Sequence, residues 1–156
     1  MTYSSRSVTF SGHFHLNAPV ERVFPLFSPL GEKYWVPGWD PEIVYPIDRE
    51  WEEGMVFRTT EESGIAVWFI SRLELSIHRV EYIRVEPNHL VARIEVKCTG
   101  KSADSTEVLT QYSFIGLSPA GNDAIGIMPA KEYDSKMARW AAWLEGHLSS
   151  DAARTL

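Results

Sequence analysis

Two charged residues in strand-like apolar segments are candidates for chemistry. Arg72 follows the apolar run Ile65–Ile70, and Glu81 lies in the next alternating segment of the chain. If these segments form a hairpin with Arg72 opposite Arg79 and Ile70 opposite Glu81, both charges face the sheet interior. An unpaired charge in an apolar interior is costly, so each would need a partner or a ligand. The alternative is that Arg72 and Glu81 lie at a rim, or pair and only hold the sheet together.

An inward Arg72 and Glu81 would support catalysis without a cofactor, such as cyclisation, dehydration or hydrolysis. Glu81 would take a proton, and Arg72 would stabilise the developing oxyanion or enolate. Apolar surroundings that raise the pKa of Glu81 toward neutrality would favour this role.

No cofactor-binding pattern is present in the sequence and no residue stands out as a nucleophile, although a serine or cysteine triad could still assemble in space. We therefore expect no cofactor. There is no phosphate loop or nucleophile elbow, and the segment "GNDAIG" lacks the glycine spacing of a dinucleotide site and is expected to be a loop. His13 and His15 share one side of an alternating segment, but that side is polar and offers no third ligand. We therefore expect no metal.

The elements that position these residues begin with a strand and two short helices. Ser7–Leu16 alternates apolar and polar residues, which predicts a strand with one buried face. Val20–Phe27 and Pro29–Trp35 are predicted as short helices, because Pro25 interrupts the helical pattern and Pro29 ends it.

The rest of the chain predicts a meander of strands and a long terminal helix, which makes an α+β arrangement. The helix carries one apolar stripe that includes Met137, Trp140 and Leu144, with Lys136 on its other side. The expected strands are Ile43–Ile47, Met55–Thr60, Ile65–Leu73, Ile77–Val85, Leu90–Cys98 and Thr106–Leu117.

This order of elements resembles the START-like helix-grip (SRPBCC) superfamily, in particular its polyketide cyclase/dehydratase-like branch. The similar motifs are "LNAPVERVFPLFS", "WVPGWDPEIV", "TEVLTQYSFIGLSPAG" and the terminal Trp-rich helix. The resemblance implies a curved antiparallel sheet of about seven strands around a long C-terminal helix, with two short helices after the first strand. It also implies a deep apolar cavity that binds a hydrophobic or aromatic small molecule.

The turn "EPNH" predicts which residues face that cavity. If its loop has two or four residues, Val85 lies opposite Leu90 and Ile83 opposite Ala92. The strand Thr106–Leu117 is ambiguous, because either Leu109 and Gln111 or Tyr112 and Phe114 could face inward. Trp39 is either a structural corner or a ring that reaches the ligand. The full set of predicted ligand-binding residues is Trp39, Trp68, Ile70, Arg72, Glu81, Ile83, Ala92, Ile94, Leu109, Gln111, Met137 and Trp140.

Composition limits the classes of partner. The chain has 156 residues, which fits one domain over 1–156 with a tail after about residue 149 that is expected to fray. The net charge is −6 and no two basic residues are adjacent, which argues against nucleic acid and anionic membranes. The longest apolar run, Ile65–Ile70, is too short for a membrane span, so we expect a cytoplasmic protein. Cys98 is expected to be a buried thiol.

Three functions remain open from the sequence. The first is a carrier or sensor for a hydrophobic small molecule, and the second is a cofactor-independent cyclase or dehydratase. The third is a co-chaperone-like module that binds a protein through the outer sheet face, where Val67 and Phe69 would lie with Val80 and Tyr82 nearby. The same exposed patch predicts a homodimer.

Overall fold

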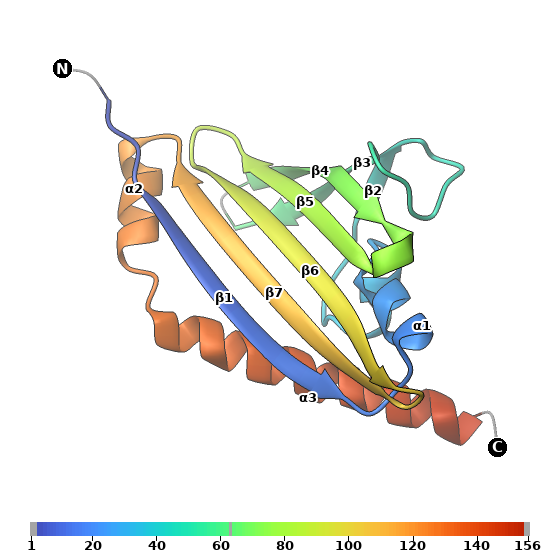
Figure 1. Cartoon of the computed structure of the whole chain (residues 1–156). Coiled ribbons are helices and arrows are strands. Elements are labelled where there is room, and N and C mark those ends of the chain that lie inside the picture. The colour runs from blue at the N-terminus through green and yellow to red at the C-terminus, as the bar shows by residue number, and fades with distance from the viewer. Residues whose placement is uncertain (1–2, 63, 155–156) are drawn as a thin grey trace.

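A curved, seven-stranded antiparallel sheet forms most of the protein (Figure 1). The computed structural model describes residues 3–62 and 64–154. The spatial order of the strands is β1-β7-β6-β5-β4-β3-β2, so the first and last strands in sequence are neighbours. The strands are β1 (Ser7–Leu16), β2 (Glu42–Tyr45), β3 (Val56–Glu61), β4 (Gly64–Glu74), β5 (Arg79–Glu86), β6 (Leu90–Ser102) and β7 (Ser105–Gly116).

Short helices follow β1, as the prolines predicted. They are the α-helix α1 (Val20–Val23) and the 3-10 helices η1 (Phe24–Phe27) and η2 (Gly31–Tyr34), and a further 3-10 helix, η3 (Leu75–Ile77), precedes β5. The chain after β7 forms the helix α2 (Pro119–Gly126), where we expected a loop. The Ser118 hydroxyl accepts a hydrogen bond from the Gly121 backbone N–H and caps this helix.

The long helix α3 (Ala130–Arg154) packs its apolar stripe against the concave side of the sheet (Figure 1). Met137, Trp140 and Leu144 are buried, and the Met137 sulfur lies 3.0 Å from the Thr110 hydroxyl of β7. Gly12 of β1 makes room for this approach, because a Cβ there would lie 2.8 Å from the Met137 side chain. The predicted fold is confirmed.

The face of β6 was predicted correctly, whereas the face of β5 was wrong. Glu86 pairs with Leu90, so the hairpin loop has three residues, with Asn88 in the left-handed conformation (φ 59°). The predicted pairing of Val85 with Leu90 needs a loop of four residues. With three residues the register shifts by one, so the two faces of β5 are exchanged. Ile83 therefore lies on the outer face, opposite Arg93 and not Ala92.

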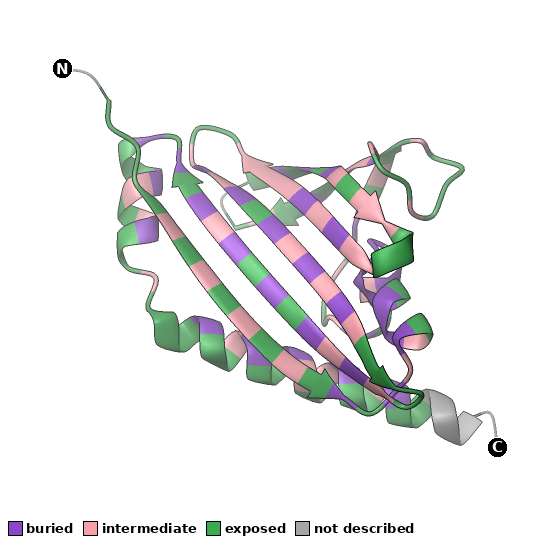
Figure 2. Ribbon diagram, viewed as in Figure 1, coloured by how far each residue is buried: buried purple, intermediate pink, exposed green. Residues whose placement is uncertain are grey.

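A bulge changes the orientation of β4 after Ile70. Ile70 pairs with Tyr82, but Arg72 pairs with Glu81, so Ser71 is the extra residue. Trp68 and Ile70 stay on the inner face as predicted, and Arg72 turns outward. The alternation of buried and exposed residues along the strands is visible in Figure 2.

A tight turn decides the orientation of β7. Ser102 pairs with Ser105, so β6 and β7 are joined by two residues, fewer than the expected strand ends at Cys98 and Thr106 implied. Tyr112 then pairs with Ile94 and faces inward, while Gln111 pairs with Glu95 on the outer face. Of the two orientations that the sequence left open, the structure has Tyr112 and Phe114 inside.

The outer face carries an exposed apolar patch on β4. Val67 and Phe69 point outward with 37% and 44% of their surface exposed, as predicted. Their neighbours are Val85 and Ile83, because Val80 and Tyr82 are buried on the inner face. A homodimer through this face stays a prediction.

The last two features of the fold concern Cys98 and the character of the helices. Cys98 is buried, and burial raises the pKa of its thiol. None of the helices in the described part of the chain has the length and apolar character that a membrane span requires.

The docking of α3 on the sheet can be tested by truncating its most buried side chain. Leu144 is 0% exposed, so Leu144→Ala is expected to lower the free energy of unfolding by about 2–5 kcal/mol. Arg139→Ala, on the exposed side of the same helix, should change it by less than about 0.5 kcal/mol. Urea denaturation followed by circular dichroism measures both, and equal effects would contradict the placement of α3.

Candidate functional site

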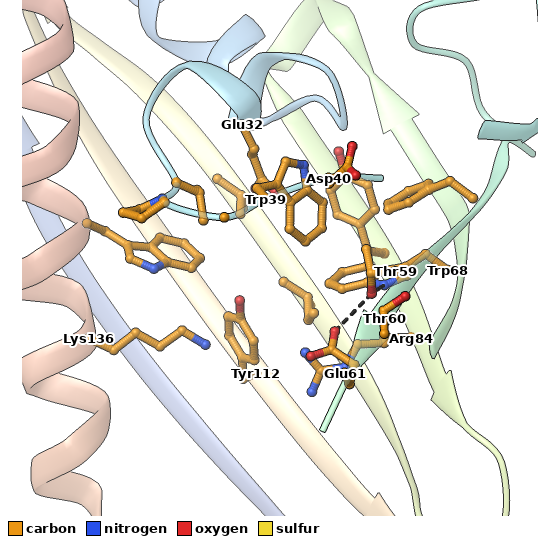
Figure 3. A pocket seen from close by; sticks show the side chains of 18 residues that line it. Glu32, Trp39, Asp40, Thr59, Thr60, Glu61, Trp68, Arg84, Tyr112 and Lys136 are labelled. Atoms are coloured by element: carbon orange, nitrogen blue, oxygen red, sulfur yellow. Dashed lines mark hydrogen bonds between the residues drawn. The ribbon is translucent and has the colours of Figure 1, made fainter. Parts of the chain in front are cut away.

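A cavity of about 430 Å³ lies between η2, the inner face of the sheet and α3 (Figure 3). Its mouth is marked by residues that are exposed to solvent, such as Gly38 and Asp40 before β2 and Thr60 on β3. The lining residues are Glu32, Val36, Pro37, Gly38, Trp39, Asp40, Phe57, Thr59, Thr60, Glu61, Trp68, Tyr82, Arg84, Ile94, Val96, Tyr112, Lys136 and Trp140.

Two indole hydrogen bonds fix the segment that covers the cavity. Trp35 Nε1 donates to the Leu26 carbonyl and Trp39 Nε1 donates to the Pro29 carbonyl, both at 2.7 Å. The Trp39 ring meets the ring of Trp68 edge to face, with 5.5 Å between centroids. Trp39 is thus both the structural corner and a wall of the cavity, the two roles that the sequence left open.

Glu32 belongs to η2, which follows η1 closely, and its side chain lines the cavity. The Ser28 hydroxyl donates to the Pro25 carbonyl and accepts from the Gly31 N–H, which ties η1 to η2. A Cβ on Gly31 would lie 2.1 Å from the Pro25 carbonyl oxygen, so only glycine allows this approach. Burial raises the pKa of Glu32 to about 8, although the positive charge of Lys136 opposes the shift.

Lys136 reaches the cavity from the opposite wall (Figure 3). Its Nζ lies 4.0 Å from the centroid of the Tyr112 ring and 5.4 Å from that of Trp140. Burial lowers the pKa of Lys136 to about 8, helped by the positive charge of Arg84 and opposed by Glu32. Glu32 and Lys136 can therefore both gain or lose a proton near neutral pH.

On the sheet side of the cavity a second set of polar side chains surrounds Trp68. Its Nε1 donates to the Thr59 hydroxyl at 2.9 Å, and that hydroxyl donates to the Glu61 carboxylate at 2.9 Å. Arg84 lies with its guanidinium carbon 5.3 Å from the centre of the Trp68 ring. Arg84 and Lys136 thus supply positive charge on two sides of one cavity.

The structure brings together some of the predicted ligand-binding residues and separates others. Those that line the cavity are Trp39, Trp68, Ile94 and Trp140. Those on the buried inner side that do not line it are Ile70, Ala92 and Met137. Those on the outer face of the sheet are Arg72, Glu81, Ile83, Leu109 and Gln111, so their predicted inward orientation is wrong.

Arg72 and Glu81 take part in a network of charges on the outer face. Arg72 Nε lies 3.5 Å from the Glu74 carboxylate, and Glu81 accepts a hydrogen bond from the Ser71 hydroxyl at 2.9 Å. The Arg72 contact lies within β4 and the Ser71–Glu81 hydrogen bond joins β4 to β5, both outside the cavity. The structure therefore removes the physical basis for a catalytic Arg72 and Glu81 in the interior.

The polar cavity residues Glu32, Arg84 and Lys136 were not among the predicted ligand-binding residues. The predicted register, with Val85 opposite Leu90 and Ile83 facing the cavity, places Arg84 on the outer face, which is wrong. Lys136 was assigned to the solvent side of α3, although it lies four residues before Trp140 and therefore on the same helix face. No sequence pattern pointed to Glu32. In residues 3–62 and 64–154 no group of three His, Cys, Asp or Glu residues is arranged to hold a metal.

Solved structures with the same architecture are numerous. A truncated norcoclaurine synthase from Thalictrum flavum is 12% identical with a TM-score of 0.67, over 92% of this chain and 96% of that one. Ara h 8.0201 is 14% identical with a TM-score of 0.66, over 93% and 99%. The Zhui aromatase/cyclase from Streptomyces sp. R1128 is 18% identical with a TM-score of 0.61, over 96% and 95%. No protein-family model and no curated protein matches this chain.

These likenesses agree with the resemblance seen in the sequence. They cover nearly the whole chain, and at identities of 10–18% they show the fold alone. The chain therefore has a helix-grip fold.

The burial of Glu32 predicts a specific pH dependence of stability. Its folded-state pKa of about 8 exceeds the ordinary value of 4.5, so the folded protein holds this proton more tightly than the unfolded chain. The resulting stabilisation is complete below about pH 4.5 and is lost as the pH rises through 8. Each unit of difference between the folded and unfolded pKa corresponds to about 1.4 kcal/mol of unfolding free energy. Because the Glu32 side chain is partly exposed, the effect is reduced, and we expect the free energy of unfolding to fall by about 2 kcal/mol.

Urea denaturation of wild type and Glu32→Gln at about pH 5 and pH 8 measures this loss. Wild type should lose stability relative to Glu32→Gln, while Glu132→Gln, at an exposed position of α3, should follow wild type. Lys136 does not interfere, because its lowered pKa affects stability only between about 8 and 10.5. Parallel curves for wild type and Glu32→Gln would contradict the burial of the Glu32 carboxyl group.

Proposed function

We propose that this protein binds an aromatic small molecule that carries an oxygen acceptor, such as a carbonyl or carboxylate group. The observation that supports this most directly is a pair of donors in the cavity. Lys136 Nζ and the Tyr112 hydroxyl both face the cavity (Figure 3), and neither is hydrogen-bonded to another described residue. A bound oxygen would satisfy both groups.

The size and walls of the cavity suit a compound of two or three fused rings. An apolar cavity of about 150 Å³ holds one benzene ring, and this cavity measures about 430 Å³. Trp39, Trp68 and Trp140 form flat walls that come from the segment before β2, from β4 and from α3. Aromatic walls of this kind favour planar ligands through stacked and edge-to-face contacts.

The charges favour an acceptor rather than a cation. Lys136 and Arg84 are positive, whereas the raised pKa of Glu32 leaves its carboxyl group mostly neutral at pH 7. The other acidic residues of the lining are Asp40 at the mouth and Glu61, whose carboxylate accepts a hydrogen bond from the Thr59 hydroxyl. An oxygen acceptor near Lys136 and Tyr112 would therefore meet hydrogen-bond donors with little repulsion. Binding in this cavity is the function of a carrier or sensor.

A second candidate function is cofactor-independent acid–base catalysis in the same cavity. It is favoured by Glu32 and Lys136, whose pKa values of about 8 allow proton transfer at neutral pH. Under this hypothesis a poly-β-keto aromatic precursor would be converted by wild type and by Glu81→Gln but not by Glu32→Gln. Mass spectrometry of the products distinguishes this outcome from a carrier, which would return the precursor unchanged.

Binding can be tested by titrating naphthalene-2-carboxylate into the protein in an isothermal titration calorimeter. We expect saturable binding with one site. Tyr112→Phe removes a single hydrogen-bond donor and should weaken binding about 5- to 10-fold, because such a bond contributes about 1 kcal/mol. Trp39→Leu removes a wall of the cavity and should weaken binding at least as much.

The control for the hydroxyl is Tyr34→Phe, since Tyr34 is 70% exposed and lies outside the cavity lining. Arg72→Ala on the outer face serves as a control for charge. Both controls should bind like wild type. Equal affinity for wild type and Tyr112→Phe would refute the role of this hydroxyl, and an absence of any binding heat for aromatic acids, ketones and phenols alike would refute the function.

A further inference from the structure

We infer that the Lys136 amine forms a reversible imine with the carbonyl carbon of an aromatic aldehyde or ketone bound in the cavity. This inference rests on the proposed function, because the carbonyl compound is one of the oxygen-bearing aromatic ligands that the cavity suits. It goes further by assigning a covalent step to one side chain.

The placement of Lys136 is the first argument. Its Nζ is held over the face of Tyr112 at 4.0 Å and near Trp140 at 5.4 Å, inside a cavity whose other walls include Trp39 and Trp68. A planar ligand that stacks between these rings would bring a carbonyl substituent to the amine. Holding two reactants together in this way converts a bimolecular reaction into an effectively unimolecular one.

The second argument is the state of the amine, since only the neutral form attacks a carbonyl carbon. Burial lowers the pKa of Lys136 to about 8, and Arg84 and Arg139 add to the shift while Glu32 and Glu61 oppose it. At pH 7 about a tenth of the amine would be neutral, compared with less than about a thousandth for an ordinary lysine. Desolvated lysines of this kind are typical of imine-forming sites.

The third argument is that the cavity contains groups for the proton transfers. The Lys136 nitrogen adds to the carbonyl carbon, and the carbonyl oxygen takes up a proton to give a carbinolamine. The carbon–oxygen bond then breaks, and water leaves with the carbonyl oxygen and both amine protons. The Glu32 carboxyl group, mostly neutral at pH 7, can give a proton to the departing hydroxyl and regain one from the nitrogen. No oxidant or reductant is needed for this step.

The chain supplies an internal comparison, because its other lysines lie outside this cavity. They are Lys33, Lys97, Lys101 and Lys131. Lys131 is exposed and lies in the first turn of α3, the same helix as Lys136. A difference in labelling between Lys131 and Lys136 therefore reports on the cavity and not on the helix.

The experiment is reductive trapping of the full chain at pH 7. The protein is incubated with 2-naphthaldehyde and sodium cyanoborohydride, and peptide mapping by mass spectrometry follows the reduced adduct at each lysine over time. We expect Lys136 to be labelled at least about tenfold faster than Lys131, as the larger neutral fraction of its amine requires. Lys136→Met should remove the fast phase, and Lys131→Met should leave it intact.

The outcomes separate this inference from the proposed function. If naphthalene-2-carboxylate binds but the aldehyde labels Lys136 no faster than Lys131, the imine is refuted and the binding function stands. If aromatic acids, ketones and phenols all fail to bind and Lys136 is not labelled faster, both are refuted. The comparison within wild type does not depend on a variant, so a folding defect in Lys136→Met would not affect the result.

Discussion

The contact between Trp35 and Trp140 joins the two parts of the protein that cover the concave side of the sheet. Their rings meet edge to face with 5.5 Å between centroids, and Phe27 packs against both. Trp140 belongs to α3, which packs on β1 and contacts β7 through Met137. Trp35 begins the segment whose Trp39 packs on β3 and β4. The helix alone cannot cover a curved sheet of this width, so the cavity is the space left where the two covers meet.

The same contact explains why ionisable groups of the cavity interact across it. Glu32 comes from one cover and Lys136 from the other, and each influences the pKa of the other. On an open sheet both side chains would be solvated and would titrate as ordinary residues. Closure by the tethered tryptophans removes water from them, so the proton chemistry of the cavity depends on the packing of Trp35 against Trp140.

The order of the elements was predictable from the sequence because it follows from patterns that repeat over many residues, and the helix-grip arrangement of those elements was implied by the family resemblance. Alternation predicted both faces of β6, the prolines predicted short helices before β2, and the stripe of Met137, Trp140 and Leu144 predicted the buried face of α3. Four cavity residues were predicted for the same reason, since Trp39, Trp68, Ile94 and Trp140 are large apolar residues on predicted inner faces or at the corner.

The polar part of the site depends on single residues that no periodic pattern records. One residue fewer in the loop at Asn88 exchanges Glu81 and Arg84 between the two faces of β5, and the extra residue at Ser71 turns Arg72 outward. A strand has a period of two, so an error of one residue reverses every assignment along it.

A helix position is less sensitive to such an error, because adjacent residues on a helix differ in direction by about 100° rather than by half a turn. Lys136 could have been found by this criterion, since it lies four residues before the inward-facing Trp140 and its long side chain can extend along an apolar surface. In this fold, charged residues one helical turn from a buried tryptophan of the terminal helix are therefore stronger site candidates than charged residues on strands whose register rests on an assumed loop length.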